Sequence, residues 1–299
     1  PMSGNGQAKF IDAHGPLLKP HHAARLDEML WQREHAEARQ MFDLVSDADK
    51  ALAETRIALQ NLDGDVNALI DALPASKAGD PGLQADRFEW RIRKGYGDSA
   101  KDLMLSQSIS AAALGQPAAW ANRRRALARD EMRNGDPALA YQMASKHFLS
   151  EGSHFADLEW LSGYIALRFL KDPKLALGHF QAHDGAVESP ISQGRAGYWQ
   201  GRAYQAMGDA EGAAKAYAQG AKFQSSFYGL LAAERGNLPF DTSLAGAPPE
   251  QDWRTSALAQ APLFQAGLLL QASGELSTAE RFWTHLAEQL ITEDAALLG

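Results

Sequence analysis

Residues 198–217 read YWQGRAYQAMGDAEGAAKAY, and this stretch decides the fold. Apolar and alanine residues return at three- and four-residue steps on both sides of Gly208-Asp209, which is the pattern of two amphipathic helices. Glycine readily takes the left-handed conformation that ends a helix, and aspartate begins a helix by accepting a bond from a free backbone N–H. The stretch therefore predicts a helical hairpin with a tight turn.

This hairpin pattern recurs along the chain. Similar sequences occur at 161–180 (LSGYIALRFLKDPKLALGHF) and at 263–282 (LFQAGLLLQASGELSTAERF). Each hairpin is interrupted by a two-residue break, and the second residues of consecutive breaks lie 31, 33, 38, 36, 37 and 66 residues apart. The last interval is close to two periods. One hairpin per roughly 34–38 residues predicts an α-solenoid, a TPR-like superhelix of about seven to eight stacked hairpins. The breaks are Arg33-Glu34, Gly64-Asp65, Gly97-Asp98, Gly135-Asp136, Lys171-Asp172, Gly208-Asp209 and Gly274-Glu275.

Composition and helix caps both predict an all-α fold. Valine occurs three times and alanine more than fifty times, and alanine costs least in a helix whereas β-branched residues favour strands. An N-cap side chain followed by proline at the first helical position marks several helix starts, since that position needs no N–H. These pairs are Asp80-Pro81, Asp136-Pro137, Asp172-Pro173 and Ser189-Pro190.

The repeats are interrupted near 73–82, 106–117 and 238–253. The last of these holds three prolines and is the best candidate for a break between two parts of the solenoid. We expect an α-superhelical repeat domain at 1–240 and further helical hairpins at 241–299.

Charge and cysteine content exclude several classes of function. The net charge is −8 with a pI near 5.6, so a nucleic-acid partner is not expected. No run of 18 apolar residues predicts a membrane span. Cysteine is absent, which excludes disulfides, thiolate metal sites and a cysteine nucleophile. The first ten residues lack an apolar signal core, so we expect a cytosolic chain or a mature or trimmed export product.

The dipeptide Glu188-Ser189 raises the question of a catalytic acid. A glycosidase acid would need a desolvated pocket and further polar groups that hold the sugar, and the residues downstream offer neither. Pro190 and an amphipathic run follow instead, so Ser189 is expected to cap a helix and Glu188 to lie beside its positive end.

No metal, cofactor or catalytic motif is found. His179 and His183 are four residues apart, but a third ligand and an HExxH pattern are missing, and solvated or capping histidines are expected. Phosphate-binding, nucleophile-elbow and dinucleotide-binding glycine motifs are also absent. The basic run at 123–125 is expected to be a solvated helix face.

Small and aromatic residues alternate between 194 and 204. Gly194, Gly197 and Gly201 are expected to let a neighbouring helix pack closely. Tyr198, Trp199 and Tyr204 are expected to fill core positions between repeats, with a groove-lining role as the alternative.

Two stretches, SPISQGRAGYWQGRAYQAMGD (189–209) and FQSSFYGLLAAERGNLPF (223–240), resemble the family of soluble lytic murein transglycosylases. The stretches 155–180 and, more loosely, 14–45 are similar to it as well. The likeness covers roughly 14–290, and the pair Y-W-x-G-R-A and S-F-Y-G-x-L-A is its most specific part.

This resemblance implies an α-superhelical domain curled into a ring or horseshoe, with a lysozyme-like catalytic domain following it in sequence. Such enzymes act in the periplasm on the β-1,4 bond between N-acetylmuramic acid and N-acetylglucosamine and leave a 1,6-anhydro end. The catalytic patterns E-S-x-[FY], G-L-M-Q-[LIV] and A-Y-N-A-G do not occur in this chain, so no catalytic residue is transferred. We expect a truncated or excised fragment without its signal peptide.

The leading hypothesis is the scaffold domain of a periplasmic lytic transglycosylase, inactive alone, whose partners are peptidoglycan strands and its own catalytic domain. A stand-alone helical-repeat adaptor that binds a protein is the alternative, and a glycan-binding module is a third. Residues that could contact glycan or a neighbouring domain are Tyr198, Trp199, Arg202 and Tyr228. No cofactor or metal is expected.

Overall fold

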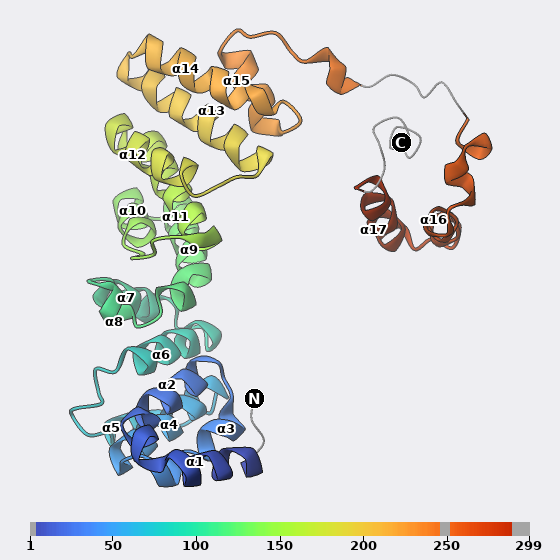
Figure 1. Cartoon of the computed structure of the whole chain (residues 1–299). Coiled ribbons are helices and arrows are strands. Elements are labelled where there is room, and N and C mark those ends of the chain that lie inside the picture. The colour runs from blue at the N-terminus through green and yellow to red at the C-terminus, as the bar shows by residue number, and fades with distance from the viewer. Residues whose placement is uncertain (1–3, 246–251, 289–299) are drawn as a thin grey trace. The chain divides into compact units, whose positions relative to one another are not determined.

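The computed structural model describes residues 4–245 and 252–288, and its regular elements are all helices (Figure 1). The prediction of an all-α fold is confirmed. The chain divides into two compact units, Pro1–Leu238 and Pro239–Gly299. A ring or horseshoe outline stays a prediction.

The first unit begins with helices of unequal length. Helix α2 packs against α3, α4 and α6, and α6 packs against α7 and α8. The short helices α3, α5 and α8 fill the turns between longer ones. The bounds are α1 Gly4–Leu18, α2 His22–Trp31, α3 His35–Arg39, α4 Asp47–Gln60, α5 Asn67–Asp71, α6 Pro81–Arg93, α7 Gly97–Gln107 and α8 Ala111–Leu114.

The second half of this unit is more regular. Each helix from α9 to α15 packs against its neighbour in sequence, and α13 also packs against α15 (Figure 1). This part is the predicted row of helical hairpins. The bounds are α9 Pro117–Asn134, α10 Pro137–Ser145, α11 Gly152–Ile165, α12 Pro173–Asp184, α13 Pro190–Met207, α14 Ala210–Gly220 and α15 Phe227–Arg235.

All four predicted N-caps are present. Each capping oxygen accepts a hydrogen bond from a backbone N–H of the first turn, and proline occupies the next position. The bonds run from Leu83 to Asp80 (2.8 Å), from Ala138 to Asp136 (2.8 Å), from Leu175 to Asp172 (2.9 Å) and from Ser192 to Ser189 (3.3 Å).

The predicted breaks end helices in the expected way, though not always at a glycine. Gly208 has φ 77°, but Arg33 and Lys171 take the same left-handed conformation with φ 60° and 59°. Side chains other than glycine pay a steric cost there. Two breaks are misplaced by sequence, because the left-handed residues are Leu62, two positions before Gly64, and Gly95, two positions before the start of α7 at Gly97.

Before Lys171 the chain widens into a π-helical turn, Ala166–Leu170. The N–H of Asp172 bonds to the carbonyl of Ala166 at 3.0 Å, six residues back. The turn continues α11 and brings the chain to the cap of α12.

Glycines on α13 bring neighbouring backbones together. A Cβ at Gly197 would overlap the backbone of Gly220 on α14, and one at Gly194 would lie 2.6 Å from Ser226 Oγ and 3.1 Å from the N of Gly229. Because only glycine leaves this space, α13 touches α14 and α15 backbone to backbone. The prediction of close packing is confirmed.

The basic run at 123–125 is not a solvated face, which corrects the prediction. Arg124 is fully buried, whereas Arg123 and Arg125 are partly exposed. Arg124 Nη1 donates to the carbonyl of Met143 at 2.8 Å, and Arg124 Nη2 donates to Ser108 Oγ at 2.6 Å. Burial lowers the pKa of Arg124 to about 10. The guanidinium thus ties α9 to the ends of α7 and α10.

The second unit is described at 239–245 and 252–288. It contains the predicted hairpin of α16 Pro262–Ala272 and α17 Leu276–Ala287, with Gly274 at φ 86° between them. Phe264 is buried between Trp253 and Trp283, with ring centroids 5.2 Å from each. Part of the irregular stretch expected at 238–253 lies outside the described residues.

Candidate functional site

The four residues named from sequence lie together on two helices. Tyr198, Trp199 and Arg202 are on α13 and Tyr228 is on α15. The Tyr228 ring is 5.5 Å from that of Tyr198 and 6.2 Å from that of Trp199. Arg202 Nη1 donates to the Tyr198 hydroxyl at 2.9 Å. The contact between α13 and α15 therefore brings these side chains together.

Two of the four offer little surface to a ligand. Tyr198 and Trp199 are each only 6% exposed, while Arg202 and Tyr228 are partly exposed. The Trp199 ring is surrounded by Phe180, Tyr164 and Tyr198, with centroids 5.8, 5.1 and 5.3 Å away. Trp199 and Tyr198 therefore belong to the core, as expected. A ligand at this place would contact the partly exposed Arg202 and Tyr228 instead.

Three partly exposed residues complete the group, and sequence reasoning missed them. Trp160 and Tyr164 lie on α11, and Arg195 lies on α13. The Arg195 guanidinium lies over both the Trp160 ring (5.3 Å) and the Tyr228 ring (5.8 Å). We call the seven residues the aromatic–arginine cluster. The signal was available, since Trp160 and Tyr164 are four residues apart, as are Arg195 and Trp199, and such pairs share a helix face.

Three N–H groups of the cluster are buried without a hydrogen-bond partner in the part of the chain that the structure describes. They are Trp160 Nε1, Trp199 Nε1 and Arg195 Nε. Buried donors are almost always satisfied in proteins, so donors of this kind call for an acceptor such as water or a ligand oxygen. The partly exposed rings and arginines of the cluster can stack against a flat apolar face and donate hydrogen bonds beside it, whereas the three buried N–H groups suit a buried water.

Glu188 and Ser189 have no catalytic geometry. Both are exposed, and Ser189 Oγ accepts the N–H of Ser192 as the N-cap of α13. A glycosidase acid needs a desolvated carboxyl group, and Glu188 is exposed to solvent. The prediction of a cap is confirmed.

His147 and His179 share a largely buried network with Glu159, which corrects the expectation of a solvated or capping His179. Glu159 on α11 accepts from His147 Nε2 at 3.0 Å and from His179 Nδ1 at 2.6 Å, and His179 Nε2 lies 2.8 Å from the Tyr141 hydroxyl. Burial alone would raise the pKa of Glu159, but the two histidine bonds outweigh it and lower that pKa to about 2. The network joins α10, α11 and α12.

His183 takes no part in this network although it lies one turn after His179 on α12. Its Nδ1 bonds to the carbonyl of Ala156 at 2.8 Å and the ring is 1% exposed. Burial lowers the pKa of His183, with the bond to Ala156 acting in the opposite direction. Across residues 4–245 and 252–288, no three acidic or histidine side chains are arranged to hold a metal ion.

Comparison with known proteins yields no family model, no curated protein and no solved structure that matches this chain. Among the described residues, no helix is both long and apolar enough to cross a membrane. A function must therefore be inferred from the residues and their geometry.

Proposed function

We propose that this chain is the non-catalytic superhelical scaffold of a soluble lytic murein transglycosylase. The observation that carries the proposal is the joint between α13, α14 and α15. The residues that resemble this family, GYWQGRA and SFYGLLA, form that joint: their glycines supply its backbone contacts, and Tyr198, Trp199 and Tyr228 supply its aromatic core. The likeness thus falls on residues that determine how three helices pack.

In the proposed enzyme the scaffold acts by positioning. It holds a lysozyme-like catalytic domain, encoded after this region, and limits which peptidoglycan strands reach it. Cleavage between N-acetylmuramic acid and N-acetylglucosamine would be carried out by that domain in the periplasm. Rigid stacked hairpins suit this role because each hairpin is fixed by its two neighbours.

The aromatic–arginine cluster is the surface we propose for contact with glycan or with the catalytic domain. Indole and phenol rings stack on flat apolar faces, and the partly exposed side chains of Arg195 and Arg202 can donate to acceptor oxygens. Retention of the chain on insoluble peptidoglycan tests the glycan role. Trp160→Ala should weaken it, and Phe240→Ala, which removes a 57% exposed ring outside the cluster, should not. Equal retention of both variants would refute a glycan role for the cluster.

A protein-binding adaptor is the second candidate. Phe227 and Leu230 on α15 are 69% and 43% exposed, and Ile191 on α13 is 62% exposed. Exposed apolar side chains of this kind mark protein contacts when they are contiguous. The gene sequence after the codon for Gly299 separates the two candidates. An open frame with E-S-x-[FY] and G-L-M-Q favours the scaffold, and a stop codon favours the adaptor.

A further inference from the structure

A cavity of about 130 Å³ lies in the first unit where α2, α4, α6 and α9 meet. It is far from the aromatic–arginine cluster in sequence, and neither the resemblance nor the proposed function assigns it a role. The cavity is partly open to solvent, because its lining includes the exposed Arg33 and Ala119 as well as the buried Leu30, Phe88 and Trp120. A dry cavity of about 150 Å³ is enough to admit benzene, which sets the scale of an occupant.

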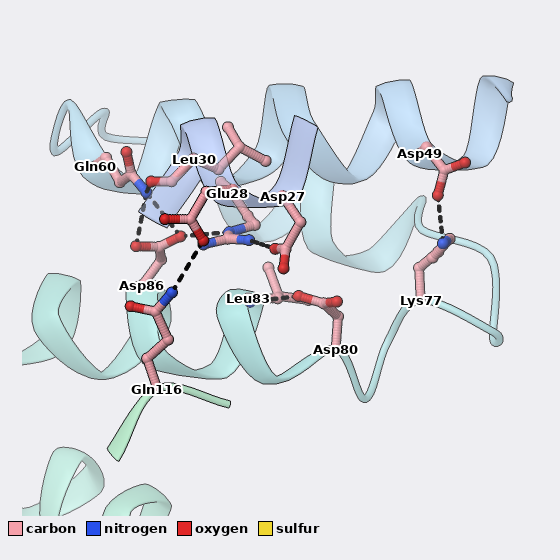
Figure 2. A network of polar contacts seen from close by, with 11 residues as sticks. Asp27, Glu28, Leu30, Asp49, Gln60, Lys77, Asp80, Leu83, Asp86 and Gln116 are labelled. Carbon is pink, nitrogen blue, oxygen red and sulfur yellow. Dashed lines mark hydrogen bonds and ion pairs between the residues drawn. The ribbon is translucent and has the colours of Figure 1, made fainter. Parts of the chain in front are cut away.

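The cavity's polar wall is a buried carboxylate that is held in place from several sides. Asp86 is 7% exposed and accepts from Arg56 Nε (2.7 Å) and from Gln60 Nε2 (2.9 and 3.0 Å) (Figure 2). Gln60 is fixed in turn by the carbonyl of Leu30 and by His35. The Oδ1 atom of Asp86 accepts only the Gln60 bond among the described residues, so it retains capacity for another donor.

The remaining charged wall residues differ in how well they are satisfied. Glu89 is bonded by Arg93 at 2.8 Å and by Arg123 at 2.9 and 3.1 Å. Arg33, by contrast, is exposed, and its guanidinium has no hydrogen bond or ion pair with the described residues, although its charge acts on Asp86 and lowers the pKa that burial of this carboxyl group raises. Its backbone has φ 60°, an unusual conformation for arginine that directs the chain around the cavity.

Aromatic rings make the apolar wall. Phe88 and Trp120 are stacked with centroids 4.7 Å apart, and both are buried. Trp31 closes another side, with the Arg56 guanidinium over its ring at 5.0 Å. A bound molecule would therefore contact aromatic rings, the guanidinium of Arg33 and a carboxylate oxygen of Asp86.

Charge balance selects the kind of occupant. The two wall carboxylates, Asp86 and Glu89, are already paired with Arg56, Arg93 and Arg123, and the outer carboxylates Asp27 and Glu28 lie beside this network (Figure 2). The charged residues of the wall itself are Asp86, Glu89 and Arg33, and of these only Arg33 lacks a hydrogen-bonded partner of opposite charge among the described residues. A ligand with no net charge, carrying an acceptor for Arg33 and a donor for Asp86, fits.

We propose that this cavity binds a small zwitterionic α-amino acid with an apolar side chain. The ligand carboxylate pairs with Arg33, its ammonium group donates to Asp86 Oδ1, and its side chain packs against Trp31, Phe88 and Trp120. Burial raises the pKa of Asp86, with Arg56 opposing, and an ammonium group would favour the ionised form. The proposal stands whether or not the chain is a transglycosylase scaffold.

The test titrates the whole chain with leucine and follows the indole N–H signals by NMR. Saturable shifts of the Trp31 and Trp120 signals are expected. 4-Methylpentanoate lacks the ammonium group and 3-methylbutylamine lacks the carboxylate, and each should bind at least about tenfold more weakly. No saturable shift with leucine, or equal binding of the three probes, would overturn the proposal.

Two variants place the binding. Arg33→Asn removes the guanidinium but keeps a residue that tolerates positive φ, and leucine affinity should fall by about tenfold or more. Lys171→Asn is the matched control, because Lys171 is an exposed cation at φ 59° outside the cavity and should leave affinity unchanged. Ala119→Leu fills the rim of the cavity and should abolish binding while both polar groups remain. Unchanged affinity in Arg33→Asn or Ala119→Leu would contradict this placement.

Discussion

At the residue scale, polar side chains act in two ways: some cap a helix within one turn, and others are buried and join one helix to another. Ser189 and the three capping aspartates follow from short sequence patterns, because a cap depends only on residues within one helical turn. Arg124 was expected in solvent, yet it is fully buried. Its partners Ser108 and Met143 come from other helices, and nothing in the run RRR indicates which of the three arginines faces them.

The same limit applies to Glu159. Its two histidine partners come from the loop before α11 and from α12, and no spacing rule relates them. Solvated or capping histidines were expected at 179 and 183, but both rings bond to groups on α11, Glu159 and the carbonyl of Ala156.

Glu159 gives a prediction for pH. Its pKa is lowered to about 2, so its stabilising effect is present above the pKa of an ordinary glutamate and is lost as pH falls toward 2. Glu159→Gln should therefore reduce the free energy of unfolding by about 2–3 kcal/mol at pH 7, and this difference should shrink between pH 5 and pH 2. Urea denaturation at pH 7, 4.5 and 3 measures it. Glu211→Gln, at an exposed pair with Lys215, is the control, and a pH-independent difference for Glu159→Gln would contradict the account.

Trp199 gives a prediction for stability. Because this ring is 94% buried among aromatic neighbours, Trp199→Ala should lower the free energy of unfolding by about 3–5 kcal/mol. Thermal and urea unfolding of the whole chain measure the loss. A decrease below about 1 kcal/mol would mean that Trp199 does not hold the joint.

At the element scale, the hairpin repeat was predictable because it rests on periodicity and on turn residues. The breaks at 208–209 and 274–275 lie where the sequence pattern predicts them, with positive φ at Gly208 and Gly274. The short helices α3, α5 and α8 and the π-helical turn before Lys171 were not foreseen, since their lengths are close to those of turns. Partial exposure of Trp160 and Arg195 also depends on how α11, α13 and α15 meet, which a single helix does not reveal.

Two glycines in neighbouring helices test the backbone contacts. Gly197→Ala places a methyl group into the backbone of Gly220 and should destabilise the chain by about 1–3 kcal/mol or more. Gly178→Ala in α12 has open space around it and should stabilise the helix by about 0.5–1 kcal/mol. Chemical denaturation of both variants gives the comparison. If Gly197→Ala matched Gly178→Ala, the close joint would be refuted.

At the scale of the whole molecule, the all-α class followed from composition, and the chain's two units are packed from helices as expected. The small cavity beside Asp86 could not be foreseen, because its wall residues are spread from 30 to 120 in sequence. The proposed scaffold function rests on residues that shape the joint between α13, α14 and α15.

The measurement that tests this proposal most directly is the release of 1,6-anhydromuropeptides from purified peptidoglycan sacculi, followed by mass spectrometry. Two proteins are compared: this chain alone, and this chain extended through whatever its gene encodes next. The account predicts release by the extended protein and none above background by residues 1–299. Release at enzyme-like rates by residues 1–299, or none by an extended protein that carries E-S-x-[FY] and G-L-M-Q, would contradict it.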